Sequence, residues 1–71
     1  MKARVNIEYS FTVNFNTYRV GDFVRVKTEF LDRYGEITEI GFDAFEISVG
    51  GDDERLITIK YDDLKSICYD D

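Results

Sequence analysis

The side chains of this chain that could do chemistry are carboxylates, tyrosines, hydroxyls, lysines, arginines and one cysteine. Histidine is absent, which excludes a histidine general base, a histidine-containing triad and any zinc site with an imidazole ligand. Because Cys68 is the single cysteine, neither an internal disulfide nor a multi-cysteine metal centre can form. The one cation near Cys68 in sequence is Lys65, so we expect this cysteine to be a small, partly buried hydrophobe.

Paired acids form the first candidate site. Asp62 and Asp63 could do acid–base work or bind a hard cation, but neighbouring residues of a strand converge only in a turn. Asp52, Asp53 and Glu54 lie in an expected turn and could approach them in space. We interpret the five acids as a face that binds a basic protein surface, the alternative being a solvated edge. We expect no catalytic residue, no metal and no cofactor.

Cations interleaved with an aromatic form the second candidate site. Arg25 and Lys27 share one side of an expected strand, and Arg33 and Tyr34 lie in the expected loop after it. Such a surface could bind nucleic acid, because the cations suit phosphate and the ring can stack on a base. The alternative is an ordinary solvated strand face, since such faces carry Arg and Lys routinely.

The charge of the chain favours the acidic surface over the basic one. The net charge is −6. Residues 1–35 carry six Lys and Arg against four Asp and Glu, whereas residues 36–71 carry three against eleven. This balance lacks the broad positive field that drives non-specific nucleic-acid binding. We therefore expect a protein partner with a basic surface, or a second copy of the chain, before nucleic acid.

Length and composition predict a single packed domain. The chain has 71 residues, of which 44% are hydrophobic and 15% aromatic, and this fits a small globular core rather than disorder. No apolar run approaches the ~20 residues of a membrane span, and no signal-peptide pattern opens the chain. We therefore expect a cytoplasmic protein that does not bind membranes.

Alternating apolar and polar residues predict strands throughout. The alternation holds over residues 4–15, which predicts one long N-terminal strand that bends or pairs with different neighbours at its two ends. The edge of that strand could also pair with a second copy. Asn14, Asn16 and Thr17 supply turn chemistry after it. Further strands are expected over residues 20–28, 36–40, 45–49, 56–61 and 66–69, with a bulge near Glu39.

Three connections carry distinct signals. Residues 29–34 form an expected loop rich in charge and aromatics, which either folds back over the core or offers a contact site. Residues 50–54 are small and polar and predict a hairpin turn. Residues 62–65 have room for one helical turn, with Asp62 as its N-cap and Leu64 facing inward.

These elements predict an all-β fold, a small five- to six-stranded barrel with a long N-terminal strand and at most one short helical turn near the C-terminus. A barrel is favoured because closure removes strand edges that so small a sheet cannot otherwise protect. The expected organisation is one domain over residues 1–71, with an added strand or hairpin arm over 1–17 and the barrel over 18–69.

The pattern resembles known small barrels. The stretch Val20-Gly21-Asp22-Phe23-Val24-Arg25-Val26, followed by Tyr34-Gly35-Glu36-Ile37, is similar to the G-D-x-V-x-V … G-x-I pattern of KOW domains, with Gly35 as the matching loop glycine. Residues 35–61 resemble the hydrophobic framework of Sm-like barrels. The resemblance covers residues 18–67 and implies an SH3-like or Sm-like barrel. Acids occur in the stretches Asp43-Ala44-Phe45 and Lys60-Tyr61-Asp62, where Sm-like proteins present an amide or cation to RNA.

We therefore expect a non-enzymatic, acidic binding module that engages a protein partner or itself, through a strand edge or through its acidic half. The alternative implied by the resemblance is a KOW-like or Sm-like module, associated with nucleic acid or the ribosome, that uses Arg25, Lys27, Arg33 and Tyr34. A third reading is a purely structural homodimer.

Overall fold

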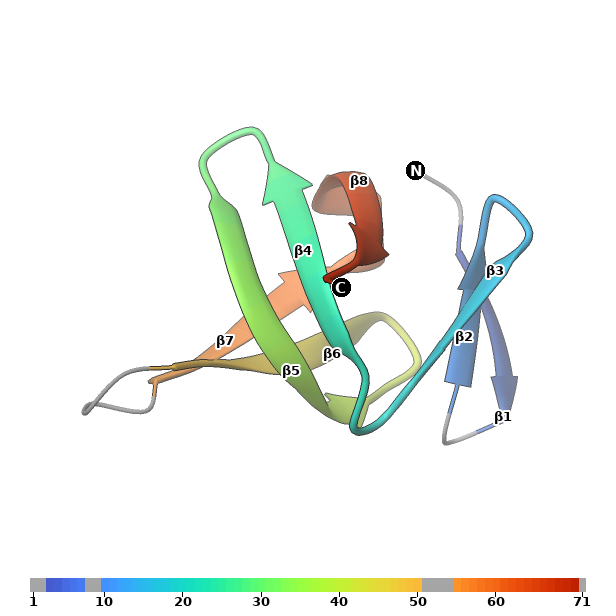
Figure 1. Cartoon of the computed structure of the whole chain (residues 1–71). Helices are drawn as coiled ribbons and strands as arrows, with labels where there is room; N and C mark the ends of the chain where they lie inside the picture. The colour runs from blue at the N-terminus through green and yellow to red at the C-terminus, as the bar shows by residue number, and fades with distance from the viewer. Residues whose placement is uncertain (1–2, 8–9, 51–54, 71) are drawn as a thin grey trace.

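The computed structural model describes residues 3–7, 10–50 and 55–70. Within these residues the chain forms eight strands and one 3₁₀ turn, so the all-β prediction is confirmed (Figure 1). In chain order the elements are β1 (Arg4–Ile7), β2 (Ser10–Val13), β3 (Asn16–Arg19), β4 (Phe23–Thr28), β5 (Asp32–Ile40), β6 (Ala44–Val49), β7 (Arg55–Lys60), the 3₁₀ turn η1 (Tyr61–Asp63) and β8 (Leu64–Tyr69).

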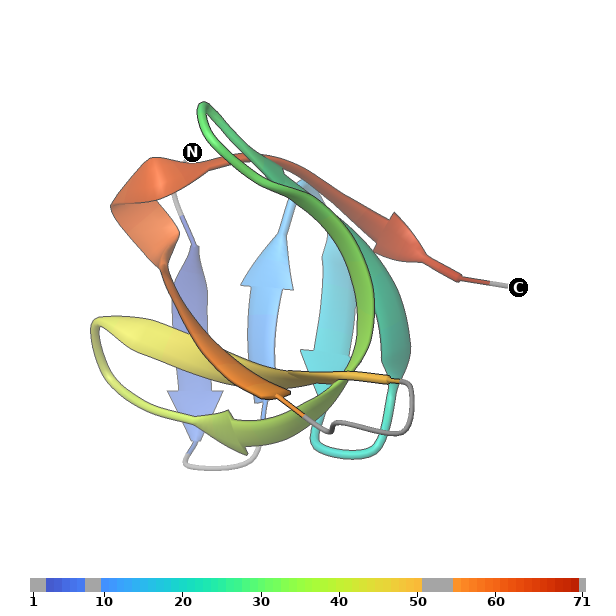
Figure 2. The ribbon, with the colours of Figure 1, turned by 90° about the vertical axis from the view of Figure 1, so that its left-hand side faces the viewer.

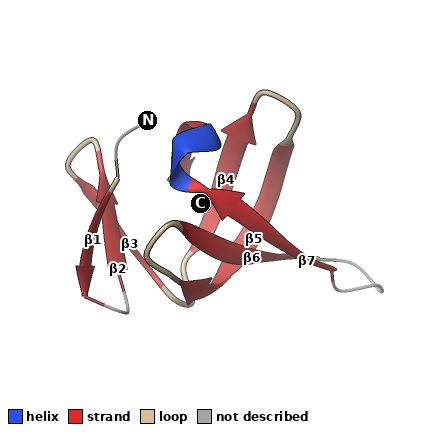
Figure 3. Ribbon diagram, turned by 180° about the vertical axis from the view of Figure 1, so that it is seen from behind, coloured by secondary structure: helices blue, strands red, loops and turns tan. Residues whose placement is uncertain are grey.

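The strands form two antiparallel sheets rather than one closed barrel. The first has the order β1-β2-β3 and the second the order β7-β6-β5-β4-β8, and no pairing joins the two among the described strands. The second sheet curls, and the first stands across its open side (Figure 2). Figure 3 shows the same arrangement from behind, with η1 between the two sheets. The predicted barrel closure is absent from the described residues. Side chains of the first sheet are part of the buried core.

The long N-terminal strand predicted over residues 4–15 is wrong, because this stretch forms a hairpin. Arg4 pairs with Thr12 and Val5 with Phe11, so β1 and β2 run antiparallel. At ~3.3 Å per residue, twelve extended residues would span ~40 Å, which exceeds the 33 Å length of the molecule. Apolar residues stay at odd positions in both strands, so the alternation in the sequence does not reveal where β1 ends and β2 begins.

A two-residue turn joins β2 to β3. Val13 pairs with Asn16, and the two residues between them, Asn14 and Phe15, have φ of 50° and 70°. Of the predicted turn residues only Asn14 is in the turn, since Asn16 and Thr17 already pair within β3. The first sheet therefore extends two residues beyond the expected boundary at residue 17.

The second sheet follows the predicted alternation closely. Val24 and Val26 are fully buried on one side of β4, and Arg25 and Lys27 project from the other, as predicted. The register shifts between Ile37 and Glu39, which confirms the predicted bulge. β6 and β7 form the predicted hairpin, although residues 51–54 of its turn lie outside the described residues.

β5 begins earlier than the sequence indicates. Asp32 pairs with Lys27, Arg33 with Val26 and Tyr34 with Arg25, so the predicted loop over residues 29–34 shrinks to three residues. Gly35, expected in a loop, lies buried within β5. The composition of residues 32–34 is typical of a loop, but these residues form a strand because they pair with Val26 and Lys27 of β4 and their neighbours.

The helical turn is a 3₁₀ turn with a different cap from the one predicted. Lys60 occupies the N-cap position without a side-chain hydrogen bond, so the prediction of Asp62 as N-cap is wrong. Tyr61 anchors the turn from inside: its hydroxyl donates to the carbonyl oxygen of Gly41 at 2.9 Å, and burial raises its pKa to about 12. Leu64 follows and is buried, as predicted.

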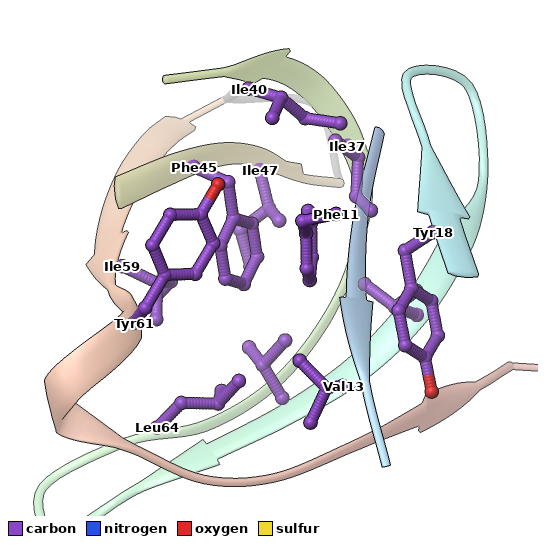
Figure 4. Packing of buried hydrophobic residues seen from close by; sticks show 12 residues of the cluster. Phe11, Val13, Tyr18, Ile37, Ile40, Phe45, Ile47, Ile59, Tyr61 and Leu64 are labelled. Atoms are coloured by element: carbon purple, nitrogen blue, oxygen red, sulfur yellow. The ribbon is translucent and has the colours of Figure 1, made fainter. Parts of the chain in front are cut away.

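Aromatic side chains join the two sheets into one core (Figure 4). The ring centroid of Phe11 on β2 lies 4.7 Å from that of Phe45, 5.2 Å from that of Tyr61 and 5.5 Å from that of Tyr18. The buried hydrophobic residues are Phe11, Val13, Tyr18, Val24, Val26, Ile37, Ile40, Phe45, Ile47, Ile59, Tyr61 and Leu64. The first sheet is therefore part of the core rather than an appendage.

Candidate functional site

The predicted acidic face is seen only in part. Asp62 and Asp63 lie in η1 and are exposed. Asp52, Asp53 and Glu54 lie outside the described residues. Within the described parts of the chain, no group of three or more cysteine or acidic side chains is placed to hold a metal ion.

The predicted basic face contains three of its four residues. Arg25 and Lys27 project from β4, and Tyr34 stands opposite Arg25 on β5, with the guanidinium carbon 5.2 Å from the ring centroid. Arg33 pairs with the core-facing Val26, so it belongs to the opposite side of the sheet. Alternation along β5 separates Arg33 from Tyr34, whereas the predicted loop would have allowed both on one face.

Asp32 belongs to this face and was missed by sequence reasoning. Its two carboxylate oxygens accept hydrogen bonds from Nε and Nη2 of Arg25, at 3.0 and 2.8 Å. The hydrogen bond to Asp32 raises the pKa of Arg25, and the same bond lowers the pKa of Asp32. Asp32 also stands opposite Lys27. A phosphate approaching this face would therefore have to compete with a carboxylate already in place.

Cys68 lies on the same outer surface. β8 pairs it with Arg25, and it is exposed, so the prediction of a partly buried hydrophobe is wrong. Pairing with an outward-facing residue of β4 decides this orientation, which local sequence does not reveal.

A cleft of about 490 Å³ lies between the β4–β5 turn, β7, η1 and the start of β8. Four consecutive residues of β7, Ile57 to Lys60, line it. Successive side chains of a strand point to opposite faces, so four in a row can line one cleft only if the strand edge faces it. β7 pairs with β6 and has no second neighbour among the described strands.

Hydrogen-bond alternation shows which backbone groups face this cleft. The N–H of Tyr61 donates to the carbonyl oxygen of Asp43 at 3.1 Å, on the β6 side. The β6–β7 register is regular along the whole of β7. In an antiparallel pair the bonded residues alternate, so the N–H and C=O groups of Leu56, Thr58 and Lys60 point away from β6. Among the described strands, the groups of Leu56 and Thr58 and the N–H of Lys60 have no partner. The C=O of Lys60, at the N-cap, accepts the first hydrogen bond of η1 instead.

Side-chain hydrogen bonds, by contrast, link β8 to the first sheet. The hydroxyl of Tyr18 donates to the carbonyl oxygen of Ile67 at 3.2 Å, and that of Tyr69 donates to the carbonyl oxygen of Thr17. The two rings also contact each other in a tilted arrangement, with centroids 4.8 Å apart. Burial is the main reason that the pKa of Tyr18 is raised. Of the two edges of the second sheet, the β7 edge is the more accessible.

The cleft combines an apolar floor with a charged rim. Leu64 and Ile59 are buried beneath it, whereas Phe30 in the β4–β5 turn is 92% exposed. Of the two alternatives expected for this segment, folding back over the core is wrong for Phe30, whereas Leu31 packs partly against the core. The charged residues of the lining are Glu29, Lys60, Asp62, Asp63 and Lys65.

A second cleft of about 450 Å³ lies beside the first. It is lined by Ala3, Phe42, Asp43, Lys60, Tyr61 and Asp62. Lys60 and Asp62 line both clefts, which therefore meet at the start of η1. Together the two linings hold four acids and two lysines, so acidic side chains outnumber basic ones around the two clefts.

Comparison with known proteins adds no relative. No family model, no curated protein and no solved structure matches this chain. Among the described residues, no helix is long and apolar enough to cross a membrane. The geometry of the β7 edge and its clefts therefore carries the functional argument.

Proposed function

We propose that this protein is a non-enzymatic binding module that takes up an extended segment of a basic protein partner as an added strand along β7. The observation that carries the proposal is the edge formed by Leu56, Thr58 and the N–H of Lys60, which has no strand neighbour among the described residues and faces a cleft with an apolar floor. In strand addition, main-chain hydrogen bonds supply affinity and alternate side chains supply specificity. The β7 edge offers donors and acceptors for main-chain hydrogen bonds, and the cleft floor offers an apolar surface for alternate side chains of the bound segment.

Charge supports a basic partner. The chain carries a net charge of −6, and four acids against two lysines line the two clefts. Such a field attracts a positively charged segment and speeds its association. A second copy of the chain brings the same net negative charge, which makes it the weaker candidate for this edge.

The order of the second sheet supports an SH3-like assignment as part of the proposal. Four consecutive strands, β4 to β7, pair each with the next, and β8 returns beside β4 after a 3₁₀ turn. This is the arrangement expected of a small SH3-like barrel whose outer strands stay unpaired. Folds of this kind serve many functions, so the assignment supports a binding scaffold and no particular ligand.

The test uses a displayed library of random peptides of about twelve residues, selected on the wild-type protein at low salt. We expect peptides rich in Lys and Arg that shift the amide resonances of Leu56, Thr58 and Lys60. Thr58→Pro should weaken their binding roughly tenfold or more, because it removes an edge N–H without touching the β6 ladder. Thr58→Val keeps the N–H and should bind like the wild type.

Salt and oligomeric state complete the test. Raising the salt from about 0.05 M to about 0.5 M should weaken binding, because the partner is held partly by charge. Peptides that bind Thr58→Pro and wild type alike, or a library without a β7-dependent binder, would refute the proposal. A dimer that forms with rising concentration and is lost in Thr58→Pro would assign the edge to a second copy instead.

The nucleic-acid module stays a prediction without a supporting observation. Arg25 and Lys27 share a face with Tyr34, but Asp32 already bonds Arg25 there. Arg33 belongs to the other side of the sheet.

A further inference from the structure

The turn that follows β4 holds Phe30 at the rim of the cleft. The N–H of Thr28 donates to the carbonyl oxygen of Leu31 at 2.8 Å, which closes the turn. The N–H of Phe30 donates to Oγ1 of Thr28 at 3.3 Å. Leu31 packs partly against the core, whereas Phe30 is 92% exposed. The backbone of the turn is therefore fixed while its largest side chain stays free for contact.

The position of Phe30 distinguishes it from the other exposed phenylalanines. Phe15 and Phe42 are also almost fully exposed, at 101% and 86%. Neither lines the cleft along β7, whereas Phe30 does. Single exposed hydrophobics are common on protein surfaces, but one that stands across a cleft from an unpaired strand edge can contact whatever pairs with that edge.

The geometry of strand addition places a side chain of the ligand beneath Phe30. Residues paired across an antiparallel ladder point to the same face. Ile57 and Ile59 point to the inner side of β7, which is the side of the cleft floor. A ligand residue opposite either of them would therefore also point inward and lie among Ile57, the floor and Phe30.

We infer that Phe30 is the anchor of the β7 site, and that the bound segment carries a large apolar side chain next to the pairing edge with Lys or Arg beside it. The basic residues would meet Glu29 on one side of the cleft and Asp62 and Asp63 on the other. This inference rests on the proposed function, because it needs a strand paired with β7. It adds the chemical class of the segment: apolar at one inward position and basic at its flanks.

The experiment takes a peptide selected as above and measures its dissociation constant with three variants. Phe30→Ala should weaken binding roughly tenfold or more, and Phe30→Trp should restore most of it. Phe15→Ala, which removes a similarly exposed ring that does not line the cleft, should bind like the wild type. Phe30 is so exposed that its removal should leave the thermal midpoint unchanged.

A double-mutant cycle then joins Phe30 to the ligand. Replacing the apolar peptide residue by Ala should weaken binding to the wild-type protein by a factor similar to that of Phe30→Ala. The same peptide change should weaken binding to the Phe30→Ala protein hardly further. If Thr58→Pro loses the peptide while Phe30→Ala binds like the wild type, the anchor is refuted and the strand site stands. If neither variant loses binding, both proposals fail. Additive losses in the cycle would also refute the contact between Phe30 and the apolar residue.

Discussion

Phe15 combines two unfavourable features in one residue. Its φ of 70° places a side chain with a Cβ in the left-handed region, and its ring is fully exposed. Left-handed backbone costs a residue other than glycine about 1–2 kcal/mol. The turn keeps this geometry because two left-handed residues match the twist of a two-residue hairpin, for which Asn followed by Gly is the preferred sequence. Asn14 supplies the first of these, and Phe15 stands in the place of the second.

Phe15→Gly is therefore expected to stabilise the protein by about 1 kcal/mol, which raises the midpoint of thermal unfolding by about 4–8 °C. The physical reason is the loss of the Cβ at a positive φ, so Phe15→Ala should give little of this gain. Thermal unfolding followed by circular dichroism measures both variants. An equal gain in the two would attribute the effect to the exposed ring rather than to the backbone.

Asp32 shows at the same scale how a site residue escapes sequence reasoning. It reads as one acid in a charged loop, and nothing nearby in the sequence pairs it with Arg25. Only the β4–β5 register brings the carboxylate within 3.0 Å of the guanidinium. The candidate nucleic-acid face therefore changed from a cluster of cations to an ion pair beside Lys27.

At the scale of elements, β5 and β6 lie close together at Gly35. A Cβ added to Gly35 would lie 2.7 Å from the carbonyl oxygen of Ser48 and 3.3 Å from the Cβ of Ile47. Backbone cannot give way as the tip of a long side chain can. Gly35 is therefore needed for close packing within the sheet, although the resemblance to KOW domains had suggested a glycine in a loop.

We expect Gly35→Ala to destabilise the protein by about 1–3 kcal/mol, because overpacking forces β6 away from β5. Gly50→Ala is the matched control, since an added Cβ there meets nothing within 4 Å. It should be neutral or stabilise by up to about 1 kcal/mol. Urea denaturation gives both free energies of unfolding. An unaffected Gly35→Ala would mean that the two strands can separate without loss.

The whole molecule depends on one core shared by the two sheets. Phe11 comes from the first sheet and contacts Phe45 and Tyr61 of the C-terminal half of the chain. Tyr18 and Tyr69 add a second link between β3 and β8. Since no ladder joins the sheets within the described strands, these side-chain contacts hold them together.

Phe11→Ala should remove about 3–5 kcal/mol of stability, which is comparable to the whole stability of a domain this small. We expect the variant to lose dispersed amide resonances from both sheets at once, whereas Phe11→Leu should stay folded. A two-dimensional NMR spectrum of each variant decides this. Native resonances that persist in β4 to β8 of Phe11→Ala would show that the first sheet is a separable cover.

The sequence predicted those parts of the fold that depend on neighbouring residues. Alternation placed Val24 and Val26 inside and Arg25 and Lys27 outside, and a break in it located the bulge near Glu39. It did not predict the hairpin within residues 4–15, because the alternation continues unchanged from β1 to β2. Of the five predicted acidic residues, Asp62 and Asp63 lie exposed in the cleft lining and the other three lie outside the described residues. Three of the four predicted basic-face residues share one face of the sheet.

By itself the sequence determined the β class, which side of each strand faces the core, the acidic charge and the absence of histidine chemistry. Each of these follows from residue type or from the two-residue period of apolar and polar side chains. Only the tertiary structure decided which strand edge has no neighbour and that Phe30 lies across the cleft from that edge. Strand pairing joins residues far apart in the chain, so the open edge of β7, the hydrogen bonds that link β8 to the first sheet and the cleft beneath Phe30 exist only after every strand has found its neighbour.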